Sequence, residues 1–142
     1  MTEENTNKMR VILCKPGELA RMIEMEDSLE AMQKMVGGRI EEYMPWEEEV
    51  AIVCNEEGKM MGLPLNRGIE DDEGRLQDII AGDFFICYAP IESEKFLSMP
   101  PELEEKYLKK FEEPERFFRD GDEIRAEKYT PRHTDHARDY AR

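Results

Sequence analysis

The sequence predicts an α+β fold, in which a small mixed and mainly antiparallel sheet carries two packed helices. Two observations favour it: short apolar runs rich in β-branched and aromatic residues alternate with turn residues, and only two segments have helical apolar spacing. At 142 residues the chain has the usual size of one domain. We expect that domain at residues 9–118, after a polar lead-in at 1–8 and before a mobile charged tail at 119–142.

Strands are expected where apolar runs are bounded by turn residues, at 9–14, 19–25, 39–44, 49–54, 59–61 and 84–89. The apolar pattern at 19–25 also allows a helical turn. Asn55 to Gly58 is predicted to be a tight turn in which Gly58 takes a positive φ, so that 59–61 returns as a hairpin. Residues 62–68 then form an irregular loop. A second hairpin-like turn is expected at 71–74.

Helices are expected in two places. Asp27 and Glu30 have the spacing of a capping box, and apolar residues recur behind them at helical spacing up to a Gly-Gly pair. A second helix is predicted to begin after Ser98 or Met99, with two prolines and three glutamates at its start, and to end at Pro114. Each helix has one apolar stripe, which predicts packing on a sheet.

The cysteines and histidines are not expected to bind metal. Cys14, Cys54 and Cys87 end or lie inside apolar runs, which is typical of reduced thiols in a core, and no C-x-x-C pair is present. His133 and His136 could share a face if their segment were helical, but they lie in the predicted tail. We therefore expect no metal site, no cofactor and no catalytic residue, since no phosphate loop or nucleophile–base pair is recognisable either.

Charge excludes one class of partner. The net charge is −14, and residues 1–114 carry 27 acidic against 13 basic residues. Such a field repels phosphates, so direct nucleic-acid binding is not expected. The amino terminus lacks the features of a signal peptide and no apolar run approaches about 20 residues, which predicts a cytoplasmic protein without membrane contact.

Acidic clusters on predicted turns form a candidate surface, made of Glu47, Glu48, Glu49, Asp71 and Asp72. Exposed turns offer neither a cleft nor a shifted pKa, so acid–base catalysis is not indicated. A solvated surface is the plain interpretation. The alternative is mimicry, in which carboxylates stand where nucleic-acid phosphates would lie on a basic partner.

A candidate ligand site surrounds the segment from Gly62 to Gly68. Its Asn66 and Arg67 offer amide and guanidinium donors that suit an anion or a planar polar ligand. Asp83 either accepts from Arg67 or contacts the ligand, and Asn55 is assigned to the same site. The competing interpretation is that turns favour such residues for conformational reasons and that an Arg–Asp pair only ties the loop down.

Four stretches in a fixed order resemble a known family: LEAMQKMVGGRIE (29–41), VCNEEGKMMGLPLNR (53–67), IIAGDFFIC (79–87) and LEEKYLKKFEEPERF (103–117). The family is one of small domains of unknown function that occur in bacterial phages, plasmids and integrated elements. The resemblance covers about residues 9–118. It implies no reaction, but it implies a setting among accessory genes, where counter-defence proteins are common.

These observations lead to a non-catalytic binding protein of a phage or mobile element, interpreted as a counter-defence inhibitor that sequesters a nucleotide-like small molecule. Such a pocket is often shared between subunits, so a homo-oligomer is compatible with it. The alternatives are an acidic mimic that blocks a basic host protein, normally a nucleic-acid-binding enzyme, and a plain protein-interaction module. An enzyme using Asp83 and a turn carboxylate around a metal is the least favoured.

Overall fold

The structure is a computed structural model, which describes residues 7–131. This part of the chain contains two helices and nine strands. In chain order they are β1 (Lys8–Cys14), β2 (Arg21–Glu26), α1 (Leu29–Val36), β3 (Ile40–Tyr43), β4 (Val50–Asn55), β5 (Leu65–Glu70), β6 (Leu76–Ala81), β7 (Phe84–Tyr88), α2 (Pro101–Phe111), β8 (Glu115–Asp120) and β9 (Glu123–Lys128).

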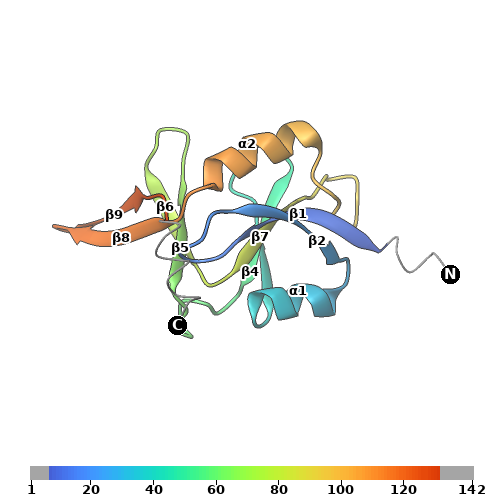
Figure 1. The fold of residues 1–142 in the computed structure, drawn as a ribbon, viewed down its shortest axis with the longest axis horizontal. Coiled ribbons are helices and arrows are strands. Elements are labelled where there is room, and N and C mark those ends of the chain that lie inside the picture. Colours follow the sequence, from blue (N-terminus) through green and yellow to red (C-terminus); the bar gives the residue numbers. More distant parts are fainter. Residues whose placement is uncertain (1–6, 132–142) are drawn as a thin grey trace.

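The predicted α+β class is confirmed, with more sheets than expected. Five strands form the main sheet in the order β2-β1-β7-β4-β3, and every neighbouring pair is antiparallel. Two further antiparallel pairs, β5–β6 and β8–β9, form separate two-stranded sheets. Both hairpins lie at one end of the main sheet (Figure 1).

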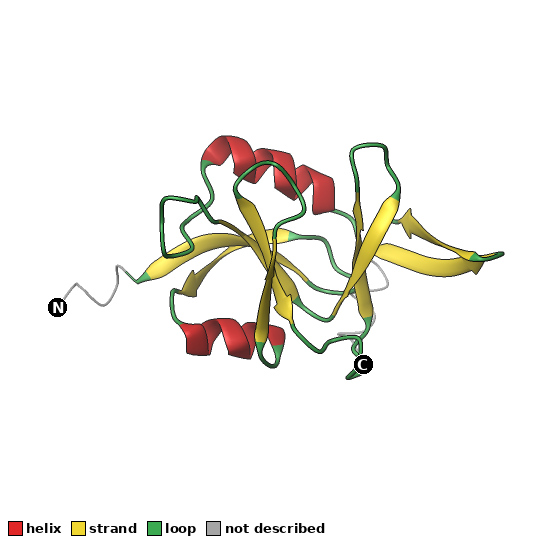
Figure 2. Ribbon diagram, turned by 180° about the vertical axis from the view of Figure 1, so that it is seen from behind, coloured by secondary structure: helices red, strands yellow, loops and turns green. Residues whose placement is uncertain are grey.

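The two helices cover opposite faces of the main sheet, as both views show (Figures 1 and 2). Strand β4 is continuously apolar because both of its faces are buried. Val50 and Ile52 pack on the side of α2, and Ala51 and Val53 pack on the side of α1 with Met32. Strands buried on both faces lose the alternation of polar and apolar residues. The core therefore has two layers, one under each helix.

Helix α1 begins one residue later than the capping box predicts. Ser28, not Asp27, is the N-cap, and its Oγ accepts a hydrogen bond from the Ala31 amide at 3.1 Å. Ser is as good an N-cap as Asp, so the spacing to Glu30 was not decisive. Gly37 ends the helix at φ +80°, as the Gly-Gly pair predicts.

Helix α2 begins without the predicted side-chain cap. Pro100 occupies the N-cap position, and Ser98 instead accepts a hydrogen bond from the Arg10 amide at 2.9 Å. The Arg10 guanidinium also reaches Glu104 in the first turn of the helix, at 3.0 and 3.2 Å. The start of α2 is thus attached to β1 rather than capped locally.

The segment after β4 differs from the prediction. Residues 59–61 do not return as a hairpin strand but continue a run of turns, and the expected loop at 62–68 contains most of β5. Gly58 does not have a positive φ. A Cβ built on it would lie 2.6 Å from the Ala81 carbonyl oxygen, so close backbone approach is what requires glycine here.

The predicted mobile tail is wrong for its first part. The boundary at residue 118 falls inside β8, and β9 follows at 123–128. The hairpin is anchored because Glu115 accepts from the Gly68 amide at 2.8 Å and Lys128 donates to the Lys110 carbonyl at 3.1 Å. The remainder of the expected tail, residues 132–142 with both histidines, and the start of the lead-in, residues 1–6, lie outside the described residues.

Candidate functional site

Arg67 is a structural residue. Its side chain is fully buried, and it donates four hydrogen bonds to oxygen atoms of the protein. Nε donates to the Phe111 carbonyl at the end of α2 (3.0 Å), and the terminal nitrogens donate to the carbonyls of Lys15 (3.4 Å) and Glu18 (2.8 Å). This guanidinium joins β5, the β1–β2 turn and the last carbonyls of α2, so it is not available to a ligand.

Asn66 completes the same arrangement. Its side-chain amide is fully buried, donates to the carbonyls of Cys14 (2.9 Å) and Gly82 (2.8 Å), and accepts from Arg67 at 2.8 Å. The amide has therefore used both of its donors and one acceptor site within the fold. The prediction that Asn66 and Arg67 form a ligand site is wrong, because both side chains are buried and donate their hydrogen bonds to other atoms of the protein.

Asn55 also has a structural role. It is 6% exposed, its amide donates to the Val36 carbonyl at 3.1 Å, and its oxygen accepts from the Glu57 amide at 2.7 Å. The first bond satisfies a carbonyl at the C-terminus of α1, which would otherwise lack a partner. Its assignment to a ligand site is not supported by this geometry.

Asp83 is the one proposed ligand residue that remains accessible. It is half-buried after the Gly82 turn, and no hydrogen bond to Arg67 joins it to the buried network. It lines an open groove of about 510 Å³ between the β1–β2 turn, the end of α1 and the segment at 63–64. The sequence predicted either that Asp83 accepts from Arg67 or that both residues line one ligand pocket. Asp83 does neither in the structure.

Charges of both signs line the groove at Asp83. Lys15 and Lys34 contribute two ammonium groups, and Glu18 contributes a second carboxylate. Desolvation by burial raises the pKa of Asp83 above its usual value, Lys15 opposes this shift, and Glu18 adds to it. A small anion could contact the two lysines only if it tolerated two carboxylates nearby.

The acidic cluster at 47–49 is divided by its contacts. Glu48 accepts from the Tyr107 hydroxyl and from Lys106 at 2.9 and 3.0 Å, and these hydrogen bonds lower the pKa of its carboxyl. Glu49 accepts from the Ile91 amide at 3.0 Å. Glu47 is exposed. Two of the three carboxylates thus hold the β3–β4 connection against neighbouring segments.

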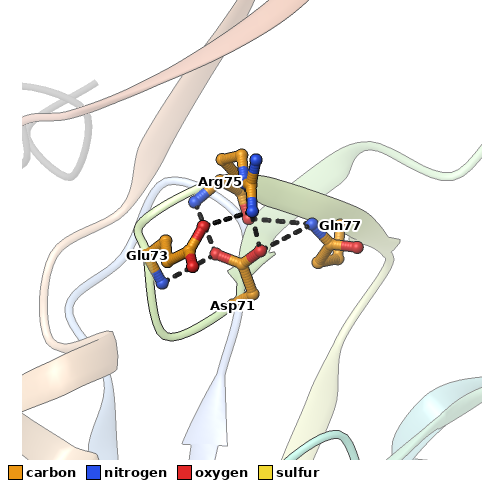
Figure 3. A network of polar contacts seen from close by, with 4 residues as sticks. All are labelled: Asp71, Glu73, Arg75 and Gln77. Carbon is orange, nitrogen blue, oxygen red and sulfur yellow. Dashed lines mark hydrogen bonds and ion pairs between the residues drawn. The ribbon is translucent and has the colours of Figure 1, made fainter.

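The other predicted acidic turn is held by its own carboxylate (Figure 3). Asp71 accepts from the amides of Glu73 (2.9 Å) and Arg75 (2.8 Å) and from the Gln77 side chain (3.2 Å), and it pairs with the Arg75 guanidinium at 3.5 Å. The backbone hydrogen bond from Arg75, together with its charge, lowers the pKa of Asp71. Asp71 is a turn residue, and Asp72 remains exposed beside it.

A row of carboxylates on the edge of the main sheet was not recognised from the sequence. Strand β3 is an outermost strand, and Glu41 and Glu42 on it are exposed. Exposed Glu47 follows at one end of β3, and Glu57 lies beyond its other end, next to Glu56. We call Glu41, Glu42, Glu47 and Glu57 the β3-edge carboxylates. Among residues 7–131 none of the four forms an ion pair.

The signal for this row was present but divided. Glu41 and Glu42 lie within the predicted strand at 39–44, Glu47 precedes the one at 49–54, and Glu57 lies in the predicted turn after it. Only the pairing of Glu41 with Cys54 and of Ile40 with Asn55 brings them to one edge. Four strand residues span about 13 Å, which sets the length of the central part of the row. The arrangement offers separated negative charges beside an unpaired strand edge.

Elsewhere the described residues offer little reactive chemistry. Burial raises the pKa of the Cys14 and Cys54 thiols to about 12, and all three cysteines are free and buried. Within residues 7–131 no group of three or more His, Cys, Asp or Glu is placed to hold a metal ion. None of the helices in that part of the chain has the length and apolar character needed to span a membrane.

A comparison with known protein families matches residues 9–112 to a model described as a domain of unknown function, DUF3846. The match spans both helices and the main sheet apart from Lys8, the first residue of β1, and it ends before the β8–β9 hairpin. No curated protein and no solved structure matches the chain.

Proposed function

The chain belongs to the DUF3846 family of domains of unknown function, and on that premise we propose that it is a non-catalytic binding protein that engages a basic partner protein through the β3 edge. The β3-edge carboxylates carry this proposal. They are exposed, they form no ion pair among the described residues, and they flank backbone groups that have no strand partner there.

Charge complementarity defines the partner. A chain with net charge −14 attracts basic surfaces at long range, and exposed carboxylates add most to the rate of association. A partner segment rich in Lys or Arg could lie along β3, and an extended one could add to the sheet by backbone hydrogen bonds. We propose a host nucleic-acid-binding enzyme, whose basic channel the carboxylates would occupy as phosphates do.

The biological setting in this proposal rests on the family resemblance. A small acidic binding protein of a phage or mobile element would act as a counter-defence inhibitor inside the bacterial host cell. The competing role for the same charges is protective, because charged side chains on an edge strand prevent unwanted pairing of sheets. The experiment below separates these two roles.

A second candidate function is sequestration of a nucleotide-like small molecule, and the groove at Asp83 favours it. The groove has a volume of about 510 Å³, within the range of small-ligand sites, and presents Lys15 and Lys34. Asp83 and Glu18 in the same groove oppose an anion. For that reason the β3 edge is the preferred site.

Capture from a lysate of the host bacterium tests the proposal. The edge variant replaces the four β3-edge carboxylates by glutamine, and the control replaces four exposed glutamates elsewhere, namely Glu24, Glu26, Glu102 and Glu105. Both variants change the net charge by the same amount. We expect the wild type and the control to retain the same host protein and the edge variant to lose it.

Equal retention by both variants would contradict the β3 edge as the binding surface. Retention by neither variant would point to net charge alone. Native mass spectrometry of the purified wild type tests the second candidate, since a bound nucleotide-like molecule that is lost in the Lys15→Ala/Lys34→Ala double variant would favour the groove.

A further inference from the structure

Strand β9 ends the C-terminal hairpin with an open edge. In the part of the chain that the structure describes, β9 pairs with β8 alone, so its outer amides and carbonyls have no strand partner. The inner face of the hairpin is held on β5, where Phe117 lies close to Gly68. Both figures show the hairpin projecting from one end of the molecule (Figures 1 and 2). An isolated two-stranded sheet is marginal, so a further strand would stabilise it.

A groove lies between β9 and the segment that joins β5 to β6. It has a volume of about 570 Å³, with residues 123–126 on one side and Glu70 and residues 74–76 on the other. Four consecutive residues of β9 line it, and Ala126 among them lies opposite Phe117, on the face of the hairpin that contacts β5. A neighbouring hollow of about 360 Å³ shares Leu76 and Ile124 with it, and Ile124 is 47% exposed.

We propose that a second copy of this chain binds at the open edge of β9, with β9 pairing antiparallel to β9 of the partner subunit across a two-fold axis. The result is a four-stranded sheet in the order β8-β9-β9-β8. The hairpin lies beyond residue 112, where the family match ends, so this inference concerns an addition to the family domain.

Symmetry restricts the register of this pairing. Two identical antiparallel edges are related by an axis perpendicular to the sheet, so that directly opposed residues point to the same face. Opposed residues must therefore differ by an even number in the sequence. Only registers centred on a residue are allowed, and the charges of β9 distinguish between them.

Charge complementarity selects the register centred on Ala126. There Arg125 lies opposite Glu127 of the partner subunit, twice by symmetry, and the small Ala126 side chain lies on the axis. A register centred on Arg125 would oppose two arginines, and one centred on Glu127 would oppose two glutamates, which is unfavourable. The register centred on Ile124 is also complementary in charge, but it pairs the turn at 121–122 and uses fewer residues of β9.

Arg125 and Glu127 are free to form ion pairs with a partner subunit at little cost. Arg125 pairs with Asp120 at 2.6 Å, but both side chains are more than half exposed. Ion pairs at such exposed sites are weak in water. Glu127 is exposed and forms no ion pair among residues 7–131. Dimer formation would give Arg125 a cross-strand partner on the same face of a continuous sheet.

A symmetric disulfide tests the register directly. In the full-length Ala126→Cys variant the two new thiols face each other across the axis, at a cross-strand distance that a disulfide can bridge. Mild oxidation should yield a covalent dimer of two 16.7-kDa chains, while the Arg119→Cys control on β8 should not. The native cysteines are buried and should not interfere. A monomer after oxidation of Ala126→Cys, or equal cross-linking of the control, overturns the proposal.

Reversing the charges of Arg125 and Glu127 provides an independent test that introduces no new thiol. The wild type should sediment as a dimer at high micromolar concentration. Arg125→Glu opposes like charges twice and should weaken dimerisation at least tenfold, and adding Glu127→Arg should restore it. A monomeric wild type, or a double variant as weak as the single one, would show that β9 does not pair with a second copy.

Discussion

At position 67 a full positive charge lies inside the protein, and it is solvated by three backbone carbonyls and the side-chain oxygen of Asn66. Burial lowers the pKa of the Arg67 guanidinium, and four hydrogen bonds compensate for the lost hydration. Three of the acceptors are carbonyls from segments that are distant in sequence: Phe111, Lys15 and Glu18. The residue therefore determines how β5 docks on the main sheet.

Replacing Arg67 by alanine should lower the free energy of unfolding by on the order of 3 kcal/mol, because buried carbonyls lose their donors and a cavity remains. Arg67→Lys should lower it less, since one ammonium can reach only some of the acceptors. Urea denaturation measures both, with Arg21→Ala on the exposed surface as the control. A stable Arg67→Ala protein would contradict the structural role.

In contrast to Arg67, replacement of Asp83 is expected to stabilise the fold at neutral pH. Desolvation raises the pKa of its carboxyl in the folded state, so the ionised group destabilises the fold at pH 7, and this cost disappears once the carboxyl is protonated in both states. Asp83→Asn should be more stable than the wild type at pH 7. The difference should shrink as the pH falls through the raised pKa and vanish below 3.8, the ordinary value. Urea denaturation at several pH values checks this, and a constant difference would contradict it.

At the level of elements, Gly58 shows how a turn can be recognised for the wrong reason. The sequence N-E-E-G predicted a positive φ, whereas the structure requires glycine because the chain passes the Ala81 carbonyl. The two explanations differ in their response to asparagine, which tolerates positive φ but has a Cβ.

Gly58→Ala and Gly58→Asn should both lower the free energy of unfolding by about 1–3 kcal/mol, because either Cβ meets backbone that cannot rotate away. Gly121→Asn is the matched control. Gly121 has φ +67° and nothing within 4 Å of its Cβ position, so asparagine should be nearly neutral there. Thermal or urea unfolding compares the three variants. A tolerated Gly58→Asn would restore the positive-φ explanation.

The elements predicted correctly are those whose signal is local. Strands β1, β4 and β7 are short apolar runs bounded by turn residues, and both helices have one apolar stripe with recognisable ends. Strand β5 was missed because its buried side chains include Asn66 and Arg67, whose partners come from distant segments. Strand β9 was missed because it contains few apolar residues. It is held in place by its pairing with β8 and does not need an apolar run of its own.

The candidate site was less predictable than the fold. Polarity marked Asn66, Arg67 and Asn55 as available donors, but only tertiary structure shows that their donors are used within the fold. Acidic character was recognised at Glu47, while Glu41 joined the same surface only through the pairing of β3 with β4. Pairing between strands cannot be derived from single stretches of sequence.

Considered as a whole, the molecule separates its polar groups by role. Asn66 and Arg67 on β5 join the β5–β6 hairpin to the main sheet by hydrogen bonds. The carboxylates on the outer edge of β3 form no ion pair among residues 7–131. The groove at Asp83 and the open edge of β9 occupy other parts of the surface. Binding at the β3 edge can therefore be measured without disturbing either.

The most direct test of the β3 edge is the salt dependence of affinity for the captured partner. Binding of the wild type, the edge variant and the control variant is measured by calorimetry over a range of NaCl concentrations. We expect the wild type and the control to weaken steeply and in parallel as salt rises, because the exposed charges are screened. The edge variant should bind at least tenfold more weakly at low salt, with a shallower dependence. Identical affinities and slopes for all three proteins would contradict the assignment of the β3 edge as the binding surface.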